Sequence, residues 1–383
     1  MMSTKSRIAW IMLIFISSMF AFKYLPRYHE YGYLLASAIT VVQSILVFKA
    51  PAVDHFLNRR LFYLIGLLGL VVVTFVAVRY IEIESLNVDR WSVIDAFISE
   101  VFAGNYPYLG KSHMDNYPGP MPMYFVISLP FYLLGDLSVL SVTGYVIAAV
   151  YLFKFRKTLS TPATVLVFIL TSFCMYWEVM VRSNIFTFTL LVLCGLVAFD
   201  RIPKFNRVKQ FLTSVIVGLL LSTRSVFVLA YLIFYLTPLR NKEMKPGLWG
   251  MLSFVSALSF GLTFVPLLLL FPTEFREVNP FVIQSSVMMP GGLVTLFAVM
   301  ALLVSLFVYE SLDKFFYSGV VLFVSILMYA LYHVVDSGFQ SAYTGSVVDI
   351  SYFLFAMPFL MYFIVKDDTS VKEYQNADVQ MSV

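Results

Sequence analysis

The chain has 383 residues and a net charge of +4, with 60% hydrophobic residues and only 13% charged residues. Soluble domains carry about a quarter charged residues, so this composition excludes an ordinary water-soluble protein and predicts an integral membrane protein. The apolar residues form continuous blocks instead of alternating, which favours an all-α, polytopic fold over an outer-membrane barrel. The two cysteines, Cys174 and Cys194, lie inside apolar blocks and fit neither a disulfide framework nor a metal-ligand pattern.

Twelve apolar blocks of roughly 15 to 25 residues have the length that a helix needs to cross a bilayer, so we expect about 12 spans. The first block follows Lys5 and Arg7, as the apolar part of a signal peptide would. No A-x-A cleavage site follows it, and it is therefore expected to stay as a membrane anchor. The expected spans are residues 8–22, 31–48, 61–81, 138–153, 161–178, 184–199, 209–222, 225–239, 247–271, 291–309, 315–334 and 350–365.

Residues 1–365 are expected to form a single transmembrane domain, followed by a polar, disordered cytoplasmic tail, 366–383. A further apolar block, 119–134, contains three prolines and directly follows Pro118, which favours a broken helix that lies at the outer surface or re-enters the membrane. Treated as non-spanning, it puts 18 of the 26 basic residues on one side of the membrane. The positive-inside rule then predicts that both termini are cytoplasmic and that residues 82–136 form a long outer loop.

The first half of this loop, 89–102, carries apolar residues at helical spacing with polar residues between them. The pattern predicts an amphipathic helix in the membrane interface, which Gly104 is placed to end. Asp89 starts this helix, and the pattern leaves two interpretations open: a helix N-cap, or a general base at the membrane surface. Asp95 lies six residues further on, about 240° around the helix, so a paired-carboxylate mechanism is not expected.

Four arginines fall on the predicted outer side: Arg90, Arg182, Arg224 and Arg276. Arg182 and Arg224 are closely flanked by apolar sequence, where a charge is costly. Each could bind phosphate, because the planar guanidinium contacts two oxygens at once. Each could equally be a structural partner of a carboxylate such as Glu178, or reach out to the interface.

Three segments of the outer loop, 89–97, 104–108 and 117–120, together resemble the first outer loop of GT-C glycosyltransferases. The resemblance is to the mannosyltransferase-like branch, which uses polyprenyl-phosphate sugars. That branch shows an acidic residue after an early span, an interfacial helix, a G-x-x-P-Y-like turn and a proline-rich stretch. This chain differs in having three predicted spans before the loop, and Arg90 where many members carry a second acidic residue.

The resemblance implies a GT-C-like fold and a glycosyltransferase of the bacterial inner membrane. Such an enzyme would move a single sugar, with inversion, from a polyprenyl-phosphate donor to a hydroxyl of a glycan, lipid or glycolipid acceptor on the outer face. Asp89 would be the general base, and Arg182, Arg224 and Arg276 would bind the donor phosphate. The residues implied in sugar and acceptor binding are Arg90, Asp95, Tyr106, Tyr108, His113, Asn184, Asn279 and Gln284.

No cofactor is expected, because basic residues can stabilise the leaving phosphate, although the sequence leaves a metal requirement open. His113 with Asp115 is too sparse a pattern to predict a metal site. Membrane lipids are the expected surroundings, and nothing predicts nucleic-acid binding. Two other functions stay open: a transporter or flippase, and a ligase of lipid-linked glycans. A transporter would carry charges along its spans, whereas charge here gathers on the predicted outer rim.

Overall fold

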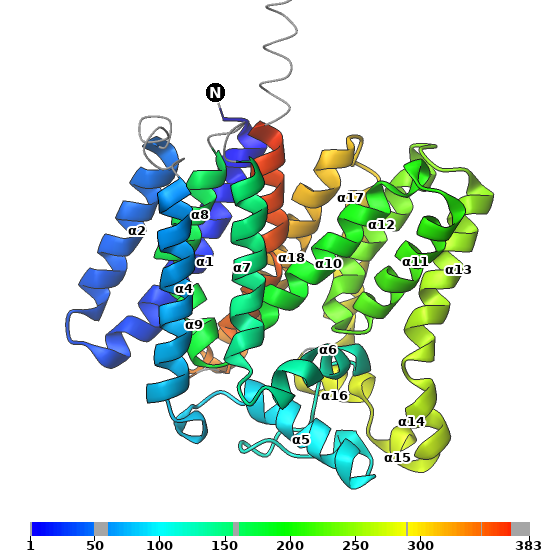
Figure 1. Ribbon diagram of the computed structural model, residues 1–383, viewed down its shortest axis with the longest axis horizontal. Coiled ribbons are helices and arrows are strands. Elements are labelled where there is room, and N and C mark those ends of the chain that lie inside the picture. The colour runs from blue at the N-terminus through cyan, green and yellow to red at the C-terminus, as the bar shows by residue number, and fades with distance from the viewer. Residues whose placement is uncertain (1, 50–59, 156–160, 289, 346, 369–383) are drawn as a thin grey trace, which may run out of the picture.

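The structure is a computed structural model that describes residues 2–49, 60–155, 161–288, 290–345 and 347–368. Its regular secondary structure is helical throughout these residues, as the apolar blocks predict. Figure 1 shows a bundle of upright helices with a layer of shorter helices, among them α5, α6 and α16, across one end. We call this end, which holds residues 82–136, the outer end, and the opposite end, which holds the N-terminus, the inner end.

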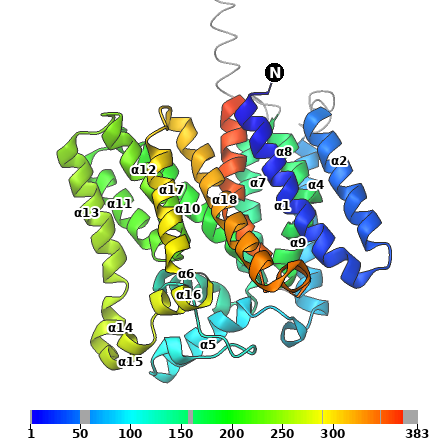
Figure 2. The ribbon, with the colours of Figure 1, turned by 180° about the vertical axis from the view of Figure 1, so that it is seen from behind.

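The bundle begins with α1, α2 and α4, which precede the long loop, and continues after it. Its helices are α1 (Thr4–Tyr28), α2 (Gly32–Lys49), α4 (Arg60–Tyr80), α7 (Ser138–Phe155), α8 (Thr161–Thr171), α9 (Phe173–Met180), α10 (Ile185–Asp200), α11 (Arg207–Leu221), α12 (Val228–Arg240), α13 (Pro246–Leu262), α17 (Gly291–Ser305) and α18 (Ser311–Ser337). A last helical segment, Ile350–Asp368, returns to the inner end beside α1, as Figure 2 shows from behind.

The outer layer consists of α5 (Arg90–Ala103), α6 (Pro122–Leu133), α14 (Val265–Leu270), α15 (Pro272–Glu277) and α16 (Pro280–Met288). Single helical turns connect several of these elements: η2 (Ile83–Ser85), η3 (Pro107–Leu109), η4 (Ile202–Lys204), η5 (Ser225–Phe227), the π-turn η6 (Gln340–Thr344) and η7 (Ile350–Phe355). The helix expected over residues 89–102 is confirmed as α5, and Gly104 ends it in the left-handed conformation, with φ at 75°.

Each of the twelve expected spans coincides with a helix or a pair of helices, but the structure does not support twelve full-length spans. Among the described residues, five helices are long and apolar enough to cross a membrane, or up to seven if each bent pair counts as one span. The difference arises because four further apolar helices are only 10 to 17 residues long and because two helix pairs are bent. Block 161–178, for example, bends by 54° between α8 and α9.

Block 119–134 forms α6, which is bent by 105° relative to α7 and does not continue it as a straight helix. The chain before α6 is tied to the bundle, because the Met121 and Met123 amides donate to the Thr223 and Ser222 carbonyls at 3.2 and 3.0 Å. Prolines at the start and inside of α6 shorten the helix to 12 residues. The sharp bend agrees with the expectation of a broken or re-entrant segment.

At the inner end, hydrogen bonds and ion pairs join segments that are distant in sequence. Ser6 Oγ donates to Asp367 at 2.6 Å, and Lys5 pairs with Asp313 at 2.6 Å. The buried Lys314 pairs with both Asp200, at 2.9 Å, and Glu243, at 2.8 Å. Residues that the positive-inside rule assigns to one side of the membrane therefore gather at one end of the bundle.

Candidate functional site

Asp89 occupies the N-cap position of α5, but its side chain makes no capping hydrogen bond. Its Oδ2 accepts instead from Asn116 Nδ2 at 2.7 Å and from Ser112 Oγ at 3.2 Å. None of the described residues donates a hydrogen bond to Oδ1. The N-cap interpretation is therefore wrong for this side chain, which is half-buried, held in one orientation and left with one oxygen available.

The loop that holds Asp89 is itself fixed against α5. His113 Nε2 lies 3.0 Å from the Leu86 carbonyl, Nδ1 lies 2.6 Å from Ser92 Oγ, and the ring stacks on Trp91. Since a carbonyl can only accept, Nε2 carries the proton in this arrangement. Both ring nitrogens are used within the protein, so His113 positions the loop, and its expected contact with the acceptor receives no support.

Arg90 points toward a segment near the C-terminus. Its guanidinium pairs with Asp349, donates to Ser351 Oγ at 3.2 Å and lies 5.2 Å from the centre of the Tyr352 ring. Burial works to lower the pKa of Arg90, but the nearby Tyr352, Asp89 and Tyr124 outweigh it and raise the pKa. Arg90 thus stays charged beside Asp89.

Arg224 differs from Arg90 and Arg182 because its guanidinium forms no ion pair with any described carboxylate. It lies 5.0 Å from the centre of the Tyr124 ring, and its buried Nε has no hydrogen-bond partner. The Tyr124 hydroxyl donates to Asn184 Oδ1, while the buried Asn184 Nδ2 has no acceptor. Unused donors on Arg224 and Asn184 therefore flank the same tyrosine, an arrangement that suits an anion.

Gln284 fixes the surroundings of Arg224. Its side-chain oxygen accepts from the Ser225 hydroxyl, and its side-chain nitrogen donates to the Gly119 carbonyl. Together with the backbone bonds from Met121 and Met123, this clamps the proline-rich stretch beside η5. Gln284 is thus a positioning residue, and its expected contact with the acceptor receives no support from these bonds.

Arg182 has little donor capacity left for phosphate. Its side chain is 1% exposed and pairs with Asp136 at 3.1 Å. It also donates to the carbonyls of Met180, Ala77 and Ile81, at 2.7, 3.0 and 3.3 Å. The geometry supports the structural interpretation, but the partner is Asp136, because Glu178 is already bonded by Tyr145, Ser183 and the Phe186 amide.

Arg276 lies on α15, away from Asp89. The α15 region packs at the far end of α5, where the Tyr106 hydroxyl donates to the Val278 carbonyl at 2.6 Å. The 14-residue α5 is about 20 Å long and separates this contact from Asp89. The structure therefore does not bring the exposed Arg276 together with Asp89, Arg90 and Arg224.

Tyr106 and Tyr108 were expected near the acceptor but lie inside the outer layer. They are 3% and 0% exposed and belong to an aromatic cluster with Phe97, Tyr124 and Phe125. Each hydroxyl donates to a backbone carbonyl, so it satisfies its hydrogen bond internally. These tyrosines hold the turn after α5 in place, because an unpaired buried hydroxyl would be costly.

Asp95 and Asn279 also have structural partners. Asp95 accepts from the Tyr132 hydroxyl at 2.8 Å, which joins α5 to α6. The Asn279 side chain accepts from the backbone amides of Phe281 and Val282, each at 3.1 Å, and so caps α16. Neither arrangement supports a direct contact with sugar or acceptor.

Two basic residues that sequence reasoning did not assign to the site lie at the outer end of α1. Lys23 is 4% exposed, donates to the Val348 carbonyl at 3.3 Å and faces the Tyr24 and Tyr343 rings. Arg27 donates to the Thr344 carbonyl. The positive-inside rule predicts few basic residues on the outer side, where both of these lie. Their exception to the rule was the feature of the sequence that could have identified them.

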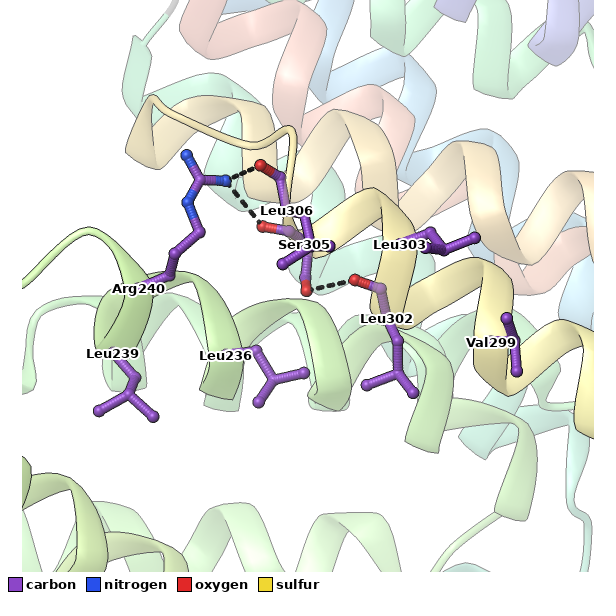
Figure 3. A pocket seen from close by; sticks show the side chains of 8 residues that line it. All are labelled: Leu236, Leu239, Arg240, Val299, Leu302, Leu303, Ser305 and Leu306. Atoms are coloured by element: carbon purple, nitrogen blue, oxygen red, sulfur yellow. Dashed lines mark hydrogen bonds between the residues drawn. The ribbon is translucent and has the colours of Figure 1, made fainter.

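Two hollows of the described surface lie away from Asp89. A polar hollow of about 640 Å³ follows α18 and is lined by Ser337 to Ser341, Thr344 and Gly345, next to the Arg27 contact. A second, apolar groove of about 390 Å³ lies at the inner end of α12 and α17 (Figure 3). The first borders the outer basic residues, whereas the second lies at the opposite end of the bundle from Asp89.

Comparisons with protein-family models, curated proteins and solved structures gave no match. The chemistry of the described residues is therefore the basis for a functional proposal. Within these residues, no group of three or more His, Cys, Asp or Glu side chains is placed to hold a metal ion.

Proposed function

We propose that this chain is a membrane glycosyltransferase that moves a single sugar, with inversion, from a polyprenyl-phosphate donor to an acceptor hydroxyl at the outer face. The observation that carries the proposal is the Asp89 carboxylate. It is oriented by Ser112 and Asn116, keeps one oxygen without a protein donor, and lies beside the charged Arg90. A carboxylate that serves only to cap a helix would not need this arrangement.

In this mechanism, Asp89 accepts the proton of the acceptor hydroxyl as the oxygen attacks the anomeric carbon. The two hydrogen bonds to Oδ2 prevent rotation of the carboxylate, so that Oδ1 faces the acceptor. Displacement from the face opposite the phosphate inverts the anomeric configuration. The loop 110–117 would then belong to the acceptor side of the site.

Arg224 is the arginine best suited to the donor phosphate, because its guanidinium keeps donors that no described residue uses. A planar guanidinium can bind two phosphate oxygens and stabilise the charge that develops on the polyprenyl phosphate as its bond to the anomeric carbon breaks. Asn184 Nδ2 offers a further unused donor next to the Tyr124 hydroxyl. Lys23 and Arg27 add positive charge at the outer end of α1. Arg182 and Arg276 are not part of this proposal.

A mannosyl transfer assay with the purified protein in lipid vesicles, using polyprenyl phosphate mannose first and other hexoses next, tests the proposal. Asp89→Asn should lower the rate by about 100-fold or more, because an amide cannot accept the proton. The variant should remain folded, since the amide oxygen can still accept from Ser112 and Asn116.

Asp95→Asn is the matched control on the same helix and should retain most of the activity, because Asp95 bonds to Tyr132 and not to the loop. If the Asp89→Asn variant transferred sugar at the wild-type rate, Asp89 would not be the general base. Movement of the lipid-linked sugar across the vesicle membrane without transfer would favour a flippase, and transfer of whole glycans would favour a ligase.

A further inference from the structure

An apolar groove runs along α12 and α17 at the inner end of the bundle. It has a volume of about 390 Å³, and six of its eight lining residues are leucine or valine. Figure 3 shows Leu236 and Leu239 of α12 pointing to the same side as Leu302 and Val299 of α17. Leu302, Leu303 and Leu306 are each at least 40% exposed. The groove is therefore open and apolar, and it lies on a face that the membrane is expected to surround.

Arg240 stands at one end of this groove. Its Nη1 donates to the Ser305 carbonyl, at 3.3 Å, and to the Leu306 carbonyl, which fixes the direction of the side chain (Figure 3). The guanidinium lies 4.3 Å from the centre of the exposed Tyr309 ring. No described carboxylate pairs with Arg240, and its Nε and Nη2 donate to none of the described residues. The edge of the guanidinium that carries Nε and Nη2 is thus free.

The surroundings of Arg240 resemble a membrane–water interface. Phe307 and Tyr309 are 66% and 70% exposed at the same turn, as aromatic anchors at the headgroup level are. The exposed Lys242 follows two residues later, while the negative charge of Glu243 is paired with Lys314 at 2.8 Å. Arg240 and Lys242 therefore lie at the end of the groove with no described ion-pair partner, in a turn that also holds the exposed Glu310.

We propose that this groove binds one acyl chain of an anionic phospholipid of the inner leaflet, with the headgroup phosphate at Arg240. The apolar walls match the chain, and the free edge of the guanidinium matches two phosphate oxygens. The ammonium group of a zwitterionic lipid such as phosphatidylcholine would lie close to Arg240 and Lys242 and be repelled by them, and a second protein copy would have to place a carboxylate there. This site is independent of the proposed sugar transfer, because it lies at the opposite end of the bundle.

Lipid retention by the full-length protein tests the proposal. The protein is delipidated in detergent, offered phosphatidylglycerol or phosphatidylcholine with identical chains, and examined by native mass spectrometry. Wild type should retain phosphatidylglycerol preferentially. Arg240→Gln should lower that preference about fivefold, the share of one basic residue, while Arg240→Lys should keep part of it. Leu302→Trp should reduce retention of both lipids by filling the groove.

The matched controls are Arg207→Gln, an exposed arginine at the start of α11, and Leu262→Trp, an exposed leucine of α13, both of which should behave as wild type. Soluble glycerol phosphate is offered in parallel and should not bind, because it lacks the chain. An unchanged preference in Arg240→Gln would overturn the proposal. So would equally tight binding of glycerol phosphate, or a change of oligomeric state in Leu302→Trp with normal lipid retention.

Discussion

At the scale of single residues, Arg182 and Arg224 show why an arginine near apolar sequence has to be judged by its remaining donors. Both follow a span, and both are flanked by apolar residues. The Nη atoms of Arg182 donate to three carbonyls and to Asp136, whereas Arg224 lies over a tyrosine ring and donates to none of the described residues, although Nε is unbonded in both. The first arginine therefore holds the fold together, and the second is available to a ligand.

Arg182→Ala should destabilise the protein strongly. Removing the guanidinium leaves three carbonyls and the largely buried Asp136 without their donor, and breaking such a buried pair costs about 3–5 kcal/mol. Thermal unfolding in detergent should show a large decrease in Tm. If Arg182→Ala kept the wild-type Tm and lost only the binding of the sugar donor, we would conclude that Arg182 binds the donor phosphate.

Arg224→Ala should instead weaken binding of the sugar donor and leave the thermal stability nearly unchanged. The loss of a charge-assisted contact of about 1.5–3 kcal/mol should raise the KM for the polyprenyl-phosphate donor by about 10-fold or more, with little change in Tm. Arg224→Lys, which keeps the charge but loses the planar fork, should fall between Ala and wild type. Unchanged kinetics in both variants would assign the phosphate to other cations, with Lys23 and Arg27 as the next candidates.

At the scale of elements, close helix crossings depend on small residues, as is common in membrane bundles. Gly218 of α11 lies against α13, where a Cβ atom would come within 2.2 Å of the Ser256 carbonyl oxygen. That contact is with backbone, which cannot move aside as a flexible side chain can. The packing of α11 against α13 therefore requires glycine at this position.

Gly218→Ala should lower stability by about 1–3 kcal/mol, because the two helices must separate or shift to admit the methyl group. Gly250→Ala is the matched control: Gly250 lies on α13, but a Cβ there meets nothing within 4 Å. That substitution should be neutral or slightly stabilising, since alanine favours the helix. Equal effects of the two substitutions on thermal unfolding would show that α11 and α13 do not cross as closely as described.

At the scale of the whole molecule, the inner ion pairs link α12, α18 and the end of α10 through Lys314. Burial works to raise the pKa of Glu243, but hydrogen bonds from Lys314 and Asn241 and the charge of Lys314 outweigh it and lower the pKa. A lowered folded pKa means that Glu243 stabilises the protein fully above its ordinary pKa of about 4.5. This contribution is lost as the pH falls through the folded pKa.

Glu243→Gln should therefore be less stable than wild type at pH 7, and the difference should shrink as the pH falls below about 4.5. Chemical or thermal unfolding of both proteins in detergent between pH 7 and 3.5 measures the difference. If the difference in stability between the two proteins grew as the pH fell, the result would contradict the pairing of Glu243 with Lys314.

The orientation in the membrane is tested by cysteine labelling with a membrane-impermeant reagent applied to intact cells. After Cys194→Ala removes the exposed natural thiol, a cysteine introduced at Asp115, whose side chain is 82% exposed, should react from outside. A cysteine at the exposed Lys204 should react only after the membrane is permeabilised. The reverse pattern would invert the predicted topology, and with it the side on which transfer takes place.

The sequence alone determined the helical fold, the long apolar helices that could cross a membrane, and α5 with its glycine end, because composition, helical periodicity and a left-handed glycine are local signals. It did not determine the number of full spans, since bends such as the 105° turn between α6 and α7 depend on packing. Nor could it show whether the Asp89 side chain caps α5, because its partner Asn116 lies 27 residues away along the chain. Only the tertiary structure decided which arginines are free, because the carboxylates that neutralise Arg90 and Arg182 come from distant segments at Asp349 and Asp136.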